Sequence, residues 1–261
     1  MKIMEIQLRQ ICMVAEKLEP VIEDLTEILG INSCYIDSGV GKFGLENNLM
    51  AVGPNFLEVV APVEEETTAG RYLQRRGGDG GYMVITQADS YNSFDRVRQN
   101  ALDDGVRIAW ETNIGYWRNC QLHPRDMEAA FLEIEADDFN EFEGYWHPAG
   151  GNGWQDKVRQ DITIDFLVVE LQSQSPDNLA GRWSRVMGKE ISLIEGATTL
   201  QLNNAALRFV ELKDDRGPGI SCIDVLVHNR REIIDRGRSR GCYVDEESVK
   251  ICGVLWRLHE R

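Results

Sequence analysis

The sequence predicts an α+β protein in which one unit, a strand followed by a helix and three more strands, occurs four times. Apolar residues switch between the two-residue period of strands and the 3.6-residue period of helices. A glycine follows each expected helix, as in Leu29-Gly30 and Met187-Gly188. The repeat is stronger evidence for the fold than any single predicted strand, because the same error of prediction would have to occur in several units.

The first unit covers residues 5–62. Its helix is marked by Pro20, which suits a first helical turn, and by Gly30, which stops it. Gln10 is a single amide in an otherwise apolar strand. The expected elements are a strand at 8–15, a helix at 20–29 and strands at 33–37, 48–52 and 56–62.

The second unit covers residues 82–136 and follows a polar, glycine-rich link in which we expect one helical turn near 72–75. The run of glycines at 77–81 lacks the lysine of a phosphate-binding loop, so we do not interpret it as one. The expected elements are a strand at 82–88, a helix at 93–102 and strands at 106–111, 119–122 and 129–135.

The third and fourth units cover residues 162–212 and 220–258. The third has an expected strand at 162–169, a helix at 178–187 and strands at 189–194, 199–203 and 206–212. The fourth has an expected strand at 220–227, a helix at 231–238 and strands at 242–244 and 249–258.

Paired units predict two domains, at 1–140 and 161–261, joined by a connector at 141–160. The connector carries Tyr145, Trp146 and Trp154 among its glycines. Aromatic side chains of this size seldom stay in water. We therefore expect the connector to pack across a domain face or to form a homodimer contact.

Composition excludes several functions. Lys and Arg total 28 and Asp and Glu total 43, which gives a net charge of −15. Such a surface repels phosphate backbones, so we expect no nucleic-acid partner and no membrane partner. The sequence shows no signal peptide and no run long enough to span a bilayer. The 6 cysteines form no CxxC pair and predict reduced thiols in the cytoplasm.

The strand that follows His123-Pro124-Arg125-Asp126 contains one carboxylate, Glu133, in an apolar run. A buried carboxylate needs a cation, a proton or a hydrogen-bond partner. We expect Glu133 to point into a concave sheet.

Four such units in two pairs resemble the vicinal oxygen chelate superfamily, the group of glyoxalases, bleomycin resistance proteins and extradiol dioxygenases. The resemblance covers nearly the whole chain and is most specific at 8–20, 55–62 and 123–135. It implies that each pair of units forms a half-open mixed-sheet barrel with helices outside.

By position, the resemblance implies ligand sites at Gln10, Glu58, Tyr82 and Glu133. Tyr82 stands where the family usually has histidine. Gln10, Glu58 and Glu133 would be the metal ligands, an oxygen-only set that favours magnesium, manganese or calcium over zinc or iron. A protein without any cofactor is the alternative. The two histidines and one carboxylate of an iron dioxygenase are absent, so we do not expect oxygenase activity.

In the second domain the matching positions are Ile164, Arg208, Cys222 and Arg257. Two arginines take the place of carboxylates, so we expect no divalent cation there. This domain is either purely structural or an anion-binding pocket.

Glu58 and Glu133 are the candidate catalytic pair. Without a cation, two carboxylates in one cavity would share a proton, and the pKa of one would rise. Such a pair could move a proton next to a carbonyl. With a metal, the site would stabilise an enolate. The alternative is that Arg118 or Arg125 neutralises one of the carboxylates.

His123 is the third candidate catalytic residue, at the cavity mouth, although a histidine that only bonds its own turn is the simpler interpretation. Gln10 and Tyr82 would orient the substrate. Trp110 and Trp117 would line the pocket, since ligand sites are mostly apolar. Core packing is the alternative role for both tryptophans.

These observations favour a glyoxalase-like enzyme of the lyase or isomerase type, acting on a small carbonyl or vicinal-oxygen substrate in the first domain. The alternative is a non-catalytic binder of small molecules, like the bleomycin resistance proteins. Fold alone does not decide between them.

Overall fold

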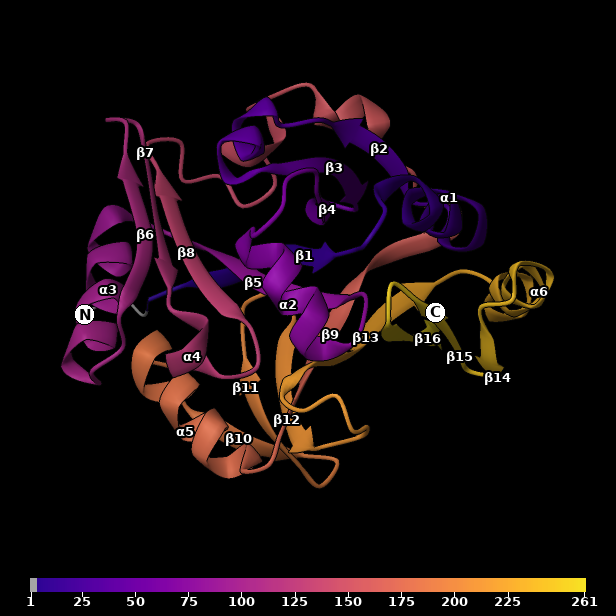
Figure 1. The fold of residues 1–261 in the computed structure, drawn as a ribbon. Helices are drawn as coiled ribbons and strands as arrows, with labels where there is room; N and C mark the ends of the chain where they lie inside the picture. Colours follow the sequence, from indigo (N-terminus) through magenta and orange to yellow (C-terminus); the bar gives the residue numbers. More distant parts are fainter. Residues whose placement is uncertain (1–3) are drawn as a thin grey trace.

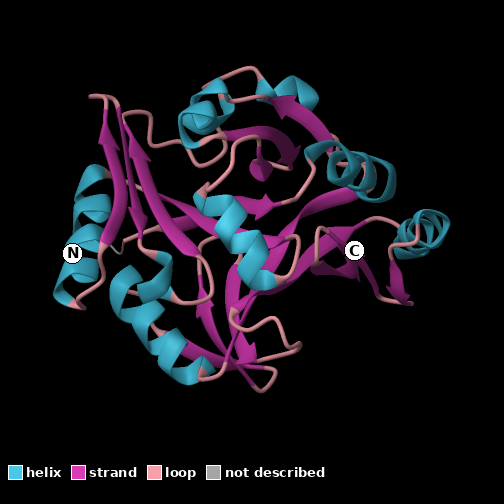
Figure 2. Ribbon diagram, in the orientation of Figure 1, coloured by secondary structure: helices cyan, strands magenta, loops and turns pink. Residues whose placement is uncertain are grey.

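The computed structural model describes residues 4–261 as a mixed α+β molecule (Figure 1). It consists of two curved units of eight strands each, β1 to β8 and β9 to β16. Figure 2 shows the strands crossing the middle of the molecule. None of the helices in this part of the chain combines the length and the apolar character that crossing a bilayer requires.

The first unit contains two copies of the predicted repeat. The first copy comprises β1 (Ile6–Val14), α1 (Leu18–Leu29), β2 (Asn32–Tyr35), the short helix η1 (Ser38–Phe43), β3 (Leu45–Val52) and β4 (Asn55–Pro62). After α2 (Thr68–Arg76), the second comprises β5 (Gly80–Ala88), α3 (Tyr91–Asp103), β6 (Ile108–Asn113), β7 (Trp117–Leu122), α4 (Pro124–Met127) and β8 (Phe131–Asp137).

The second unit repeats the pattern after a connector that carries η2 (His147–Ala149) and η3 (Trp154–Lys157). Its first copy comprises β9 (Thr163–Ser173), α5 (Pro176–Met187), β10 (Ile191–Ile194), β11 (Ala197–Gln201) and β12 (Ala206–Glu211). Its second comprises β13 (Gly219–Val227), α6 (Arg230–Arg240), β14 (Tyr243–Asp245), β15 (Ser248–Ile251) and β16 (Val254–Glu260).

Three expected elements differ from the sequence prediction. The glycine-rich link forms a full helix, α2, because Thr67 caps its first turn by accepting a hydrogen bond from the Gly70 N–H. The expected strand at 249–258 is a hairpin of β15 and β16. It turns at Cys252 and Gly253, where both φ angles are positive (51° and 68°), as a tight two-residue hairpin requires. The polar residues before the apolar run that contains Glu133 form the one-turn helix α4.

In both units the first strand of each copy pairs in parallel with the last. β1 pairs with β4 and β5 with β8, while β1 and β5 run antiparallel at the centre. The second unit has the same arrangement, with β9 and β13 at its centre. A single backbone pair, Ile220 with Gly81, joins the two sheets. Each sheet therefore presents a convex side and a concave side.

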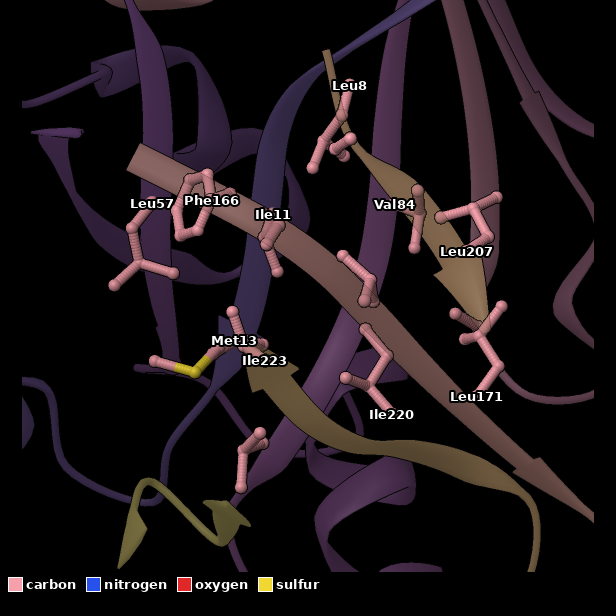
Figure 3. Packing of buried hydrophobic residues seen from close by; sticks show 14 of the residues in the cluster. Leu8, Ile11, Met13, Leu57, Val84, Phe166, Leu171, Leu207, Ile220 and Ile223 are labelled. Atoms are coloured by element: carbon pink, nitrogen blue, oxygen red, sulfur yellow. The ribbon is translucent and has the colours of Figure 1, made fainter. Parts of the chain in front are cut away.

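The convex sides of the two units face one another and share one hydrophobic core. Figure 3 shows side chains from both units in this core: Leu8, Ile11, Met13, Leu57 and Val84 from the first, and Phe166, Leu171, Leu207, Ile220 and Ile223 from the second. All ten are fully buried. At the two ends of this core, α1 packs against α6 and α3 against α5.

Two arginines cross between the units next to the shared core. Arg76 is buried and its Nη1 donates to the carbonyl oxygens of Arg216, Gly217 and Pro218 at 3.0, 2.6 and 2.8 Å. In return, Arg216 donates to the carbonyls of Arg76, Gly78 and Asp79. The loop between β12 and β13 is thereby fixed to the start of β5.

The connector packs on its own chain. Trp146 and Trp154 are buried, and both rings lie against Phe56 of β4. Of the two placements expected from the sequence, the structure shows packing across a domain face. The connector roofs the concave side of the first unit, which we call the first concave face.

Candidate active site

Strand register brings the predicted residues onto the first concave face. Gln10 pairs with Ile85, and Ile85 pairs with Glu133 on the far side of β5. Glu58 lies one row away, opposite Cys12. Residues paired in register point to the same side of a sheet. Gln10, Glu58 and Glu133 therefore all lie on the first concave face.

Glu58 is held in the hollow by two amides. Its Oε2 accepts from Gln10 Nε2 at 3.0 Å and its Oε1 from Asn47 Nδ2 at 2.6 Å. Only 8% of the residue is exposed. Burial raises the pKa of Glu58, the hydrogen bonds from Asn47 and Cys12 oppose this effect, and the charge of Glu133 adds to it.

The amide of Gln10 has a fixed orientation. Its Oε1 accepts from Trp146 Nε1 at 2.9 Å. An indole N–H can only donate, so the amide oxygen must face Trp146 and the amide nitrogen must face Glu58. The one atom of Gln10 that could hold a metal is thus occupied by the connector.

Glu133 lies beside a second buried carboxyl group that the sequence prediction missed. Three strand spacings, about 14 Å along the sheet, separate β4 from β8, and no hydrogen bond among the described residues joins Glu133 to Glu58. The partner of Glu133 is Glu135, close enough to bond through a shared proton. Burial chiefly, and then the charge of Glu133, raise the pKa of Glu135 well above its ordinary value.

The β7 strand completes this carboxyl pair. Asn119 Nδ2 donates to Glu133, and Trp117 Nε1 donates to Glu135 at 2.8 Å. Trp117, expected to line the pocket, instead reaches it through its indole N–H. Asp137 continues the same row and is also buried. The alternation of Glu133, Glu135 and Asp137 at a period of two was the available signal for one carboxyl face.

Among the described residues, no arginine forms an ion pair with Glu58, Glu133 or Glu135. Arg118 stacks over Tyr91 and bonds Asp95 at 3.5 Å. The cation nearest the face is Arg9 of β1, which is fully buried against Phe56, Trp146 and Trp154. Burial lowers its pKa to about 10, and Asp137 and Glu135 oppose that shift. Its Nε and Nη1 have no hydrogen-bond partner within residues 4–261.

Tyr82 packs at one end of the face. Its ring lies edge-on to Tyr72 of α2 and to Phe131 of β8. Burial raises the pKa of its phenol. No hydrogen bond among the described residues joins Tyr82 to Gln10, Glu58 or Glu133. In the structure Tyr82 therefore packs against Tyr72 and Phe131.

The structure does not bring His123 to the carboxylates. His123 caps α4, and its Nδ1 accepts from the Arg125 backbone N–H at 3.2 Å. Burial lowers its pKa, with Arg107 adding to the effect. The histidine at the mouth is His147 of the connector, stacked on Trp117 at 4.1 Å between ring centroids. Burial also lowers the pKa of His147.

Trp110 lies at the rim rather than inside the face. It is 41% exposed and meets Phe43 of η1 edge-on at 5.5 Å between centroids. Lys42 lies over the same ring. β6 and η1 belong to the two outer edges of the first unit, so this contact joins the edges across the mouth of the hollow.

The metal ligands expected at Gln10, Glu58 and Glu133 do not fit a shared cation in this arrangement. Trp146 occupies the oxygen of Gln10, two amides occupy Glu58, and Asn119 and Glu135 engage Glu133. Within residues 4–261, no group of three or more His, Cys, Asp or Glu side chains is placed to hold a metal.

A separate surface hollow of about 580 Å³ lies between α1 and α6, lined by Glu27, Asn229, Arg236 and Arg240 among others. Ion pairs within and between the helices, such as Arg240 with Asp24 at 2.6 Å, account for its charged lining. It is the groove between two packed helices and shares no lining residue with the first concave face.

Comparison with known proteins assigns the fold. No protein-family model and no curated protein matches this sequence. A solved structure of a hypothetical protein from Staphylococcus aureus aligns over 98% of this chain and 100% of its own, at TM-score 0.66 and 12% identity. A Mn(II)-bound glyoxalase from Novosphingobium aromaticivorans aligns over 97% of this chain and 81% of its own, at TM-score 0.65 and 11% identity.

The chain therefore has the two-domain fold of the vicinal oxygen chelate superfamily, in its four-module form. This confirms the fold class expected from the repeat.

Proposed function

We propose that the chain is an isomerase or lyase that moves a proton next to the carbonyl of a small substrate, and that Glu58 is the group that moves it. The observation that carries this proposal is the environment of Glu58. The carboxyl is buried, oriented by Gln10 and Asn47, and has a raised pKa. A base with a raised pKa transfers protons efficiently near neutral pH.

The roles follow from the chemistry of the groups. Ionised Glu58 removes a proton from the carbon next to the carbonyl, and the electron pair moves to the carbonyl oxygen. Glu135, whose pKa is raised well above its ordinary value, supplies the acid for that oxygen. Delivery of the proton to the other face of that carbon, or to the former carbonyl carbon, completes an isomerisation as the acid takes back the proton of the oxygen, whereas loss of a leaving group from the next carbon completes a lyase reaction.

The substrate enters when the connector moves. Trp146 covers Gln10, and its side chain is fully buried. Displacing its indole would open the hollow beside Glu58 and release the Gln10 amide to bind a substrate oxygen. His147, half-buried on Trp117, would then stand at the mouth.

A divalent cation belongs to this proposal only in the opened state. With Trp146 withdrawn, and with Glu58 and Glu133 released from their present hydrogen-bond partners, the freed oxygen of Gln10 would join both carboxylates in an oxygen-only set. Such a set would hold magnesium, manganese or calcium in preference to zinc or iron. The Mn(II)-bound glyoxalase that shares this fold supports the idea.

A reducing compartment suits the chain. All 6 cysteines are free thiols, 4 of them buried. We therefore place the protein in the cytoplasm as part of the proposal.

The test compares Glu58→Gln with Glu46→Gln, a matched change on the exposed side of the neighbouring strand. Solvent deuterium entering the carbon next to the carbonyl is followed by NMR across a panel of small 2-oxo and vicinal-oxygen compounds. We expect Glu58→Gln to slow exchange by about 10²–10⁴-fold, and Glu46→Gln to leave it unchanged. Exchange that survives in Glu58→Gln would overturn the proposal. Compounds that stabilise the protein without exchanging would point to a binding protein.

A further inference from the structure

The concave side of the second unit carries a charged network in place of the first unit's carboxyl face. Register places Arg208 opposite Glu170, and Glu170 opposite Cys222. Asp224 lies in the next row, opposite Arg257 of β16. Arg208, Cys222 and Arg257 are the predicted equivalents of first-domain site residues. Glu170 and Asp224, the two carboxylates that the structure adds to them, were not predicted from the sequence.

Asp224 is the centre of this network. Its carboxylate accepts from Arg208 Nη2 at 3.0 Å and from Arg257 Nη1 at 2.9 Å. His259 Nε2 lies 3.1 Å away. Arg208 Nη1 also bonds Glu170 at 3.3 Å. One buried carboxylate thus fixes the orientation of three basic side chains from two strands.

The network is layered by charge. The side chains of Asp224 and Glu170 are only 1% and 6% exposed. Those of Arg208, Arg257 and His259 are 18%, 33% and 44% exposed. The carboxylates therefore lie beneath and the basic groups lie toward solvent. The solvent-exposed side chains of this network are thus basic, although the chain as a whole has a net charge of −15.

This layering leaves donors unused. No hydrogen bond among the described residues involves Arg257 Nε or Nη2, nor Arg208 Nε. The same face includes partly exposed apolar side chains in register with the network: Val168 opposite Asp224, Leu255 opposite Cys222 and Leu226 opposite His259. Unlike the first concave face, this one has no indole placed over it to use the donors.

We propose that this second concave face binds a small organic oxyanion, with Arg257 and Arg208 contacting its negative group and Val168, Leu226 and Leu255 its apolar part. A guanidinium presents paired N–H donors that match a carboxylate or a phosphate. Asp224 is a positioning residue, because it holds both guanidinium groups without facing solvent itself.

The test is calorimetric titration of the full chain, in low-chloride buffer, with sodium benzoate and separately with sodium phosphate. We expect one of the two to bind saturably with one site per chain, which also tells a carboxylate ligand from a phosphate ligand. Arg257→Gln should weaken that binding at least 10-fold. Arg231→Gln, the same change on α6 at a side chain that is 91% exposed, should leave it unchanged.

Arg257→Lys separates charge from geometry, since it keeps the charge but loses the paired donors. We expect Arg257→Lys to bind the anion with an affinity between those of wild type and Arg257→Gln. Its free energy of unfolding should equal that of wild type. Glu58→Gln should bind the anion as the wild type does, so failure of the first-domain proposal would not affect this one. The inference is overturned if neither anion binds saturably, or if Arg257→Gln and Arg231→Gln bind equally.

Discussion

At the scale of single residues, the first concave face is governed by competition between burial and hydrogen bonding. Burial favours the neutral form of a carboxyl, and donated hydrogen bonds favour the charged form. Glu58 receives bonds from Asn47 and Gln10, and its pKa is nevertheless raised. Glu135 receives one from Trp117, lies beside a second carboxyl, and its pKa is raised further. Burial therefore outweighs the donated hydrogen bonds at both carboxyl groups.

Glu135→Gln should change how stability depends on pH. A raised folded-state pKa means that the folded state binds a proton which the unfolded state has released, so wild-type stability falls as the pH rises above about 4.3. The variant loses this dependence. We expect its free energy of unfolding to gain up to about 1.4 kcal/mol per pH unit relative to wild type, between the unfolded and folded pKa values.

Urea unfolding at pH 5, 6, 7 and 8 measures this difference. The comparison removes opposing contributions such as that of Asp126, whose pKa the hydrogen bond from Arg107 lowers to about 2. Glu19→Gln, at an exposed position of α1, serves as the control. Parallel pH curves for Glu135→Gln and wild type would contradict a buried shared proton.

At the scale of elements, the repeat made the strands and long helices predictable, because each needs only its own period and a stop signal. α1 and α5 end at Gly30 and Gly188, whose positive φ angles admit no ordinary side chain without strain. The hairpin of β15 and β16 was missed because the apolar run continues through its turn. Cys252, a non-glycine residue in a left-handed conformation, gave no sequence signal.

The carboxyl face was predicted only in part, for a similar reason. The single carboxylate in an apolar run led to the expectation that Glu133 points into a concave sheet, and strand register puts its side chain on the first concave face. The proton partner, Glu135, and the occupancy of Gln10 by Trp146 depend on contacts between elements. The distance along the chain from Gln10 to Trp146 gives no local pattern to detect.

Trp146→Phe tests the connector as a roof, with Trp154→Phe as its matched control. Both indoles pack on Phe56, but only Trp146 bonds a partner, whereas Trp154 Nε1 has none in the described structure. Losing the Trp146 N–H leaves Gln10 Oε1 unpaired. We expect Trp146→Phe to lower the free energy of unfolding by about 1–3 kcal/mol more than Trp154→Phe.

The same pair of variants tests whether the connector controls the binding of a divalent cation. Manganese titration should show tighter binding to Trp146→Phe than to wild type or to Trp154→Phe, because the Gln10 oxygen is released. Equal affinities in all three proteins would sink the idea that the connector controls a metal site.

At the scale of the whole molecule, the two units are bound into one folding unit by the core between their convex sides. Ile223→Ala should destabilise both. Ile223 is fully buried there, and truncation at such a site costs about 2–5 kcal/mol. We expect amide exchange to accelerate in β1 as much as in β13. Leu193→Ala, at a residue that is 74% exposed, should change neither. Faster exchange confined to β13 would show that the units unfold separately.

The back-to-back packing of the units also constrains how such a chain can diverge. A substitution on the convex side of either unit also disturbs the other unit, because the two share one core. A substitution on a concave face disturbs only the residues of that face. Substitutions on the two concave faces should therefore be tolerated more readily than substitutions in the shared core. This is consistent with one scaffold carrying acidic groups beneath aromatic rings in the first unit and solvent-facing arginines in the second.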